Sequence, residues 1–86
     1  MSKMRAKFQL QSVEQFGNSQ GITGEKLKFH AVAKSSAYPA DGSDEDNTYA
    51  KFSPSASCEI LVMNPALFGQ FKPGEKYYVD FTLADA

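Results

Sequence analysis

Apolar and polar residues alternate in the first part of the chain, which is the pattern of a β-strand with one buried face. In residues 4–11 the apolar positions are Met4, Ala6, Phe8 and Leu10, and the polar positions are Arg5, Lys7, Gln9 and Gln11. In residues 26–34 the alternation returns, with Leu27, Phe29, Ala31 and Ala33 on one face and Lys26, Lys28, His30, Val32 and Lys34 on the other. The glycine-rich stretch between them, residues 16–25, predicts a loop or a wide hairpin connection, so the two strands are expected to be antiparallel.

Three further segments are predicted as strands. Residues 48–52 (TYAKF) form a short strand that ends near Pro54, because proline lacks the backbone donor of a ladder. Residues 55–63 are the most apolar run of the chain, and residues 76–83 alternate once more. Residues 35–47, between the second and third strands, consist of turn-forming residues.

One helical turn is predicted before the last strand. Asn64 is a favourable N-cap, Pro65 suits the first helical position, and Gly69 ends the turn. Leu67 and Phe68 are expected to pack over one end of the predicted barrel, with Phe71 closing behind Gly69. Residues 72–75 (KPGE) predict a type II turn, because proline and glycine fit its two central positions.

These elements predict a single all-β domain over residues 1–86, a small five-stranded antiparallel barrel or sandwich with one short helical turn. The order of the elements is loosely like that of an oligonucleotide-binding (OB) barrel, which is an analogy of fold alone. The predicted core contains the residues in the inward register of the strands: Phe8, Leu10, Leu27, Phe29, Ala31, Cys58, Ile60, Val62, Tyr77, Val79 and Phe81.

Composition and length narrow the class of protein. The chain is 42% hydrophobic and 13% aromatic, as expected of a globular domain, and its one cysteine excludes an internal disulfide. No segment has the length of a signal peptide's apolar region or of a membrane span, so a soluble protein in a reducing compartment is expected. A domain of 86 residues has a small core, so we also expect a homo-oligomer.

Charge is distributed unevenly about the net value of −1, with +4 in residues 1–34 and −5 in residues 35–86. Four of the six residues at 41–46 are acidic. This segment could offer oxygen ligands to Ca²⁺ or Mg²⁺, but it lacks the spacing of an EF-hand, and no metal or other cofactor is predicted. A solvated loop or a protein-docking loop fits better, and its candidate docking residues are Asp41, Asp44, Glu45, Asp46, Asn47 and Tyr49.

A basic face is predicted where the first two strands pair. Its residues are Arg5, Lys7, Lys26, Lys28 and Lys34. Such a face could attract the phosphates of nucleic acid, although the neighbouring Phe8 and Phe29 point inward and offer no stacking rings. A solvated sheet face protected by lysine is the simpler interpretation.

The sequence gives no support to an enzyme. His30 is the only histidine of the sequence, so a metal site or a catalytic pair of histidines is not expected. Cys58 lies in an apolar segment, where a small core residue is a simpler interpretation than a nucleophile. The serines at 53, 55 and 57 lack a nucleophile elbow, and no phosphate-binding glycine loop is present.

Three segments of the chain, MRAKFQLQSV, DEDNTYAKFSPSAS and NPALFGQFKPGEKYYVDFT, resemble small proteins of tailed bacteriophages. The resemblance extends over most of the 86 residues and contains no catalytic motif. It implies a phage origin and a place among virion or virion-assembly proteins, in the virion or in the host cytoplasm, and it transfers no site residues.

Two functions from different classes follow. The first is a non-enzymatic phage accessory or structural protein, capsid-associated or taking part in assembly, that binds other phage proteins or its own copies through loops and sheet edges. The alternative is a small OB-like nucleic-acid-binding or host-directed regulatory protein that uses the basic face. Neither involves a membrane.

Overall fold

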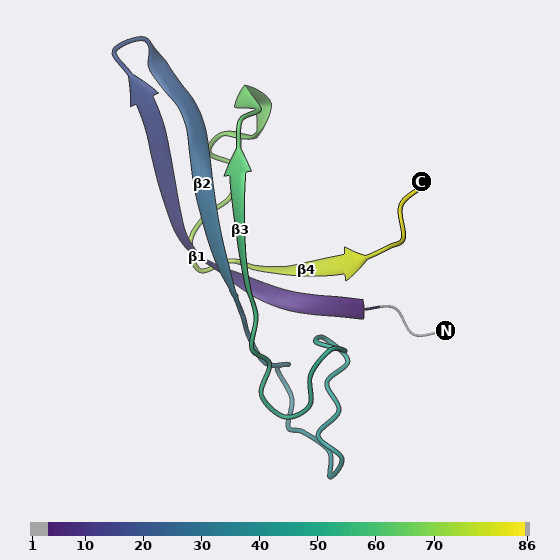
Figure 1. The fold of residues 1–86 in the computed structure, drawn as a ribbon. Helices are drawn as coiled ribbons and strands as arrows, with labels where there is room; N and C mark the ends of the chain where they lie inside the picture. The colour runs from purple at the N-terminus through teal and green to yellow at the C-terminus, as the bar shows by residue number, and fades with distance from the viewer. Residues whose placement is uncertain (1–3, 86) are drawn as a thin grey trace.

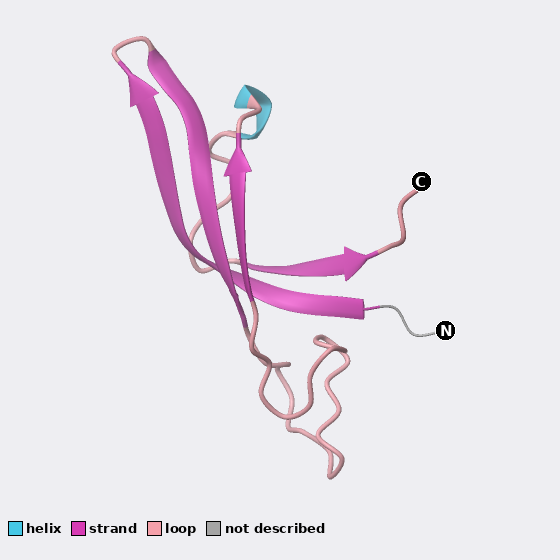
Figure 2. Ribbon diagram, in the orientation of Figure 1, coloured by secondary structure: helices cyan, strands magenta, loops and turns pink. Residues whose placement is uncertain are grey.

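The protein is described by a computed structural model over residues 4–85. Four strands form one antiparallel sheet in the order β3-β2-β1-β4 (Figure 1). The strands are β1 (Met4–Asn18), β2 (Gly21–Ala31), β3 (Ser57–Val62) and β4 (Lys76–Phe81). A 3-10 helix, η1 (Pro65–Leu67), precedes β4, and the rest is loop (Figure 2). The all-β class is confirmed, but the sheet is open, so the prediction of a five-stranded barrel or sandwich is wrong.

Strand β1 is long and bent, and its two halves have different partners. Residues Met4 to Gln9 pair with β4, from Phe81 back to Lys76, while Phe8 to Asn18 pair with β2. The register shifts between Leu10 and Ser12, and a bulge of this kind bends a strand. Figure 1 accordingly shows β4 and the first part of β1 running at a wide angle to β2 and β3.

The first connection is shorter than predicted, because β1 and β2 both extend into the glycine-rich stretch. The chain reverses here into an antiparallel strand as predicted, but only Ser19 and Gln20 form the turn, so the predicted length of the connection, residues 16–25, is wrong. Gly17 shows why a glycine lies within a strand here. A Cβ atom at this position would clash with the backbone carbonyl of Gly21, so the glycine allows the two strands to approach closely beside the turn. Strand β2 also ends at Ala31, which leaves Lys34 outside it.

The predicted strand at residues 48–52 is absent. A single bridge joins Ser43 and Lys51, and Phe52 has a positive φ of 64°, which breaks an extended strand. Thr48 instead uses its backbone and its side chain to bond the edge of β1 at Arg5. Without this strand, no strand within residues 4–85 joins the two edges of the sheet.

The core lies on one face of the sheet and follows the predicted register. Its buried apolar side chains are Ala6, Phe8, Leu10, Leu27, Phe29 and Val62. Ala31, Cys58, Tyr77 and Val79 are partly buried against them. Ile60 and Phe81 are 46% and 50% exposed, so their assignment to the core is wrong. Both have the inward register, but within residues 4–85 the side chains packed over the core leave these two about half exposed.

The turn before β4 has the predicted cap. The Asn64 Oδ1 atom accepts a hydrogen bond from the Ala66 N–H at 3.1 Å, and Pro65 begins η1. Phe68 and Phe71 pack against the core, but Leu67 is 42% exposed and does not. At residues 72–75, Gly74 has a φ of 93° and the Glu75 N–H bonds the Lys72 carbonyl, as a type II turn requires.

Replacing Asn64 by alanine is expected to lower the free energy of unfolding by about 1 kcal/mol, because the cap bond is lost. Urea denaturation at a fixed protein concentration measures this. Asn64→Asp keeps the acceptor oxygen and should remain close to the wild type. An equal loss in both variants would show that the cap bond contributes nothing.

Within residues 4–85, no helix has the length and apolar character that crossing a membrane requires.

Candidate functional site

The loop between β2 and β3 lies against the first half of β1, where β2 no longer supplies backbone partners. The Lys7 N–H donates to the Asn47 Oδ1 atom at 2.8 Å, and the Lys7 carbonyl accepts from the Val32 N–H at 3.0 Å. The Arg5 N–H donates to the Thr48 hydroxyl at 2.9 Å, and the Arg5 carbonyl accepts from the Thr48 N–H at 3.0 Å. The loop therefore takes the place of a strand, using backbone N–H groups of Val32 and Thr48 and the side chains of Asn47 and Thr48, and it covers this part of the β1 edge.

Asn47 is fully buried and links three parts of the chain. Besides accepting from Lys7, its amide donates to the Val32 carbonyl at 2.8 Å and to the Asp44 carboxylate at 3.2 Å. A buried amide with this many partners fixes the loop, because each bond would leave an unpaired buried group if it were broken.

Asp44 is the second buried polar residue of the loop. Its Oδ1 atom accepts from the backbone N–H groups of Asp46 and Asn47, and its Oδ2 atom accepts from the Tyr38 hydroxyl at 3.1 Å. Burial alone would raise the pKa of Asp44, but the hydrogen bonds to its carboxylate outweigh burial, so the pKa is lowered. Asp44 is thus a charged centre around which residues 38–47 are organised.

The other acidic residues of the loop have separate partners. Asp41 accepts from the Ser43 N–H, which lowers the pKa of Asp41. Glu45 bonds the Lys34 ammonium at 3.0 Å, and this bond lowers the pKa of Glu45. Asp46 lies 3.5 Å from the Lys7 ammonium, with both side chains largely shielded from solvent.

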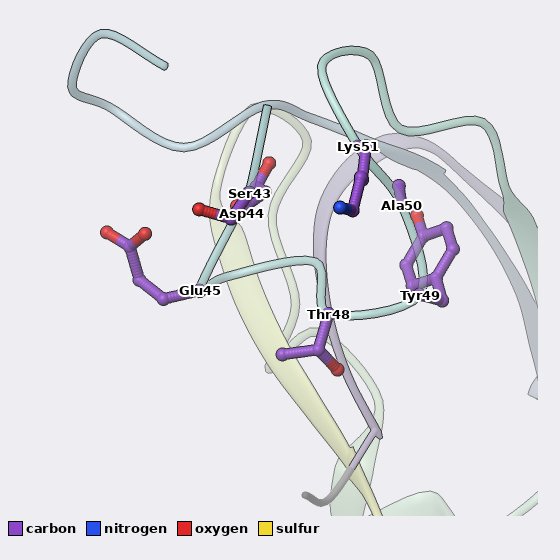
Figure 3. A pocket seen from close by; sticks show the side chains of 7 residues that line it. All are labelled: Ser43, Asp44, Glu45, Thr48, Tyr49, Ala50 and Lys51. Carbon is purple, nitrogen blue, oxygen red and sulfur yellow. The ribbon is translucent and has the colours of Figure 1, made fainter. Parts of the chain in front are cut away.

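The six predicted docking residues therefore fall into two groups. Asp44 and Asn47 are buried and Asp46 is mostly covered, so these three hold the loop together and are not available to a partner in this conformation. Asp41, Glu45 and Tyr49 are exposed. An open pocket of about 420 Å³ lies among residues 43–45 and 48–51, and Figure 3 shows Glu45 on one side of it and Tyr49 on the other. Partial burial of the Tyr49 hydroxyl raises its pKa.

The acidic residues point to different partners and do not converge. Within the part of the chain that the structure describes, no group of three or more His, Cys, Asp or Glu side chains is placed to hold a metal ion.

Ca²⁺ or Mg²⁺ at millimolar concentration is therefore expected to leave the melting temperature unchanged. Differential scanning calorimetry with and without each ion, with a chelator as reference, makes the comparison. A metal-dependent rise in the melting temperature that disappears in Asp41→Ala or Asp46→Ala would contradict this.

The predicted basic face is present on the surface opposite the core, but most of its charge is paired. Two ion pairs on this face join neighbouring strands, Arg5–Asp80 at 2.6 Å and Lys26–Glu59 at 3.7 Å. A third, Lys7–Asp46 at 3.5 Å, joins β1 to the loop. Lys34 lies beyond the end of β2 and pairs with Glu45. Of the five predicted residues, Lys28 alone has no ion pair among residues 4–85. Little unpaired positive charge is left on this face for a phosphate.

The sequence analysis missed Glu25, which is 1% exposed on the apolar face. One of its oxygens accepts from the Gln15 side chain at 2.7 Å and from the Gly69 N–H at 3.1 Å, which ties the segment after η1 to the sheet. The signal was available in the alternation of β2, because Glu25 has the same parity as Leu27 and Phe29. It was hidden by the glycines that predicted a loop there.

Comparison with known proteins finds no family model, no curated protein and no solved structure that matches this chain.

Proposed function

We propose that the protein acts without catalytic turnover, by associating with protein surfaces, its own copies included, as a component of a larger assembly. The observation that supports this most directly is the amount of exposed surface. The chain exposes 6175 Å², whereas a compact monomer of 9.4 kDa exposes about 5,000 Å². The excess, about 1,200 Å², is larger than the roughly 800 Å² that each partner buries in a standard interface.

The dimensions of the molecule agree with this. Its radius of gyration is 15.7 Å, whereas a compact domain of 86 residues has about 12 Å. The principal extents of 55 × 34 × 16 Å describe a thin, elongated molecule. A stable domain has at least two layers around its core, and here side chains from the loops, such as Phe68 and Phe71, cover part of the sheet, so a partner would complete the second layer.

Exposed apolar side chains indicate where a partner could lie. Two hollows of about 250 and 220 Å³ open on the apolar side of the sheet, and Phe8 lines both. Phe81 lines the first and Ile60 the second. Apolar surface of this kind on a small soluble protein is typical of an interaction site.

We infer from the resemblance to tailed-phage proteins that the assembly is a virion or an intermediate in its construction, in the host cytoplasm or in the particle. The alternative, nucleic-acid binding through the basic face, has less support, because four of its five cations are paired with carboxylates. It is retained as one outcome of the test.

Sedimentation over a wide range of protein concentration tests the proposal, together with co-sedimentation with purified virions or their assembly intermediates. Self-association or stoichiometric incorporation is the expected result. A monomer at every concentration that joins no particle, and that binds single-stranded DNA or RNA with an affinity falling steeply with salt, would replace this proposal with the alternative.

A further inference from the structure

Among the residues that the structure describes, strand β4 forms one edge of the sheet, with β1 on one side and no strand on the other. The register determines which backbone groups point to the open side. The backbone groups of Arg5 and Lys7 bond the loop, away from β4, and these residues lie opposite Asp80 and Tyr78. In an antiparallel ladder, two residues that lie opposite each other without exchanging hydrogen bonds both direct their N–H and C=O groups away from each other. Lys76, Tyr78 and Asp80 therefore direct theirs to the open edge of β4.

The side chains of β4 are complementary to a second copy of the same strand. When two antiparallel copies are centred on Tyr78, Lys76 of each copy lies opposite Asp80 of the other, and Tyr77 lies opposite Val79. The outward-directed residues 76, 78 and 80 then face one another, as hydrogen bonding between the strands requires. We propose that two copies of this chain pair antiparallel along β4, with Tyr78 on the two-fold axis, to form one continuous eight-stranded sheet.

No other self-pairing of β4 has this property. Centring the pair on Lys76 or on Asp80 places like charges opposite each other, and centring it on Tyr77 or Val79 forms no ion pair. Opposite charges across strands stabilise a sheet and like charges destabilise it, so charge alone selects the register centred on Tyr78.

The other edge of the sheet lacks this complementarity. Strand β3 contains one charged residue, Glu59, so no register of β3 with itself can form an ion pair. Pairing centred on Glu59 would instead bring two carboxylates together. Charge thus favours β4 as the edge that pairs. Because a two-fold contact uses the same edge of both copies, pairing along β4 joins two copies and no more.

Arg5 prepares β4 for this contact. Its guanidinium bonds both oxygens of Asp80, at 2.6 and 3.1 Å, and lies 4.7 Å from the centre of the Tyr78 ring. These contacts hold Asp80 and Tyr78, two of the three residues whose backbone faces the edge, in place before a partner arrives. In the dimer each Asp80 carboxylate would lie between Arg5 of its own chain and Lys76 of the second copy.

The dimer deepens the proposed function, on which it rests, because it names a second copy as the first partner, and it extends the sheet at its edge while leaving the apolar face to another partner. Its most direct test is amide hydrogen exchange measured at several protein concentrations. The amides of Lys76, Tyr78 and Asp80 should gain protection as the concentration rises, while those of Tyr77 and Val79, which face β1, should change little. Equal behaviour of the two sets in a protein that associates would contradict pairing along β4.

Charge variants test the register by sedimentation equilibrium. Lys76→Glu should raise the dissociation constant of the dimer by about tenfold or more, since two attractive pairs become repulsive. Lys72→Glu makes the same change of charge outside β4 and should leave the constant unaltered. An equimolar mixture of Lys76→Glu and Asp80→Lys should form a heterodimer, because each strand then meets its opposite charges. An unaltered constant in Lys76→Glu would overturn the register.

Cross-linking keeps the test independent of these charges. In a Cys58→Ala background, Tyr78→Cys should form an intermolecular disulfide readily, because two residues on the axis have Cα atoms about 5.5 Å apart. Thr82→Cys should not, because the two copies would be separated by about 26 Å along the strands. Efficient cross-linking of Thr82→Cys, or none of Tyr78→Cys, would overturn the proposal.

The failure of this inference and the failure of the proposed function are distinguishable. Pairing along β4 would be refuted by a protein that joins assemblies but is monomeric by itself. It would also be refuted by a protein that self-associates while the amides of Lys76, Tyr78 and Asp80 gain no protection. Either result would leave the proposed function in place. A protein that neither self-associates nor joins any assembly would refute both.

Discussion

Replacing Phe29 by alanine is expected to lower the free energy of unfolding by about 3 to 5 kcal/mol, enough to leave little folded protein. The ring is buried in the centre of the sheet face, where its centroid lies 6.3 Å from that of Phe8 and 5.9 Å from that of Tyr77. Its removal would open a cavity beside the rings of Phe8 and Tyr77, and a core this small has few side chains that could fill it. Urea denaturation followed by circular dichroism measures the effect.

Phe16→Ala is the matched control, since this phenylalanine is 39% exposed and lies on the opposite face of the sheet. Its loss should be about 1 kcal/mol or less. Both variants must be compared with the wild type at one protein concentration, because association adds to the apparent stability. A similar, small effect of both substitutions would show that Phe29 is not a core residue.

The second large effect is expected at Asn47, where alanine should lower the free energy of unfolding by about 2 to 4 kcal/mol. The substitution leaves the Lys7 N–H and the Val32 carbonyl without their partner and removes a donor from the Asp44 carboxylate. The loop would then detach from β1, which would expose the Lys7 and Arg5 backbone on a free strand edge.

Local detachment can be separated from global unfolding by amide exchange. Protection at Lys7 should fall in Asn47→Ala before protection in β2 does. Asn18→Ala is a suitable control, because Asn18 is exposed and bonds only the neighbouring turn. Stability within about 0.5 kcal/mol of the wild type in Asn47→Ala would mean that the loop is not fixed by this amide.

The alternation of apolar and polar residues was enough to place the first part of β1, the second part of β2, β3 and β4, and to tell their faces apart. Phe8, Leu10, Leu27 and Phe29 are buried as this pattern predicts, because the direction of a side chain in a strand follows from its parity alone. The Asn64 cap and the turn at Pro73 and Gly74 were predictable for a similar reason, since each depends on the conformational preferences of a few adjacent residues.

The tertiary structure decided which segments pair and which polar residues are buried. Residues 48–52 have the composition of a strand, but Thr48 bonds Arg5, 43 residues away, and the segment turns. Asp44 and Asn47 look like a solvated surface in the sequence, yet they are interior because the edge of β1 lacks backbone partners there. The burial of a polar residue and the pairing of a strand depend on groups distant in the chain, and local periodicity does not depend on those groups. For the same reason, only the fold could show that β4 lies at an open edge, where the complementary charges of Lys76 and Asp80 can meet a second copy.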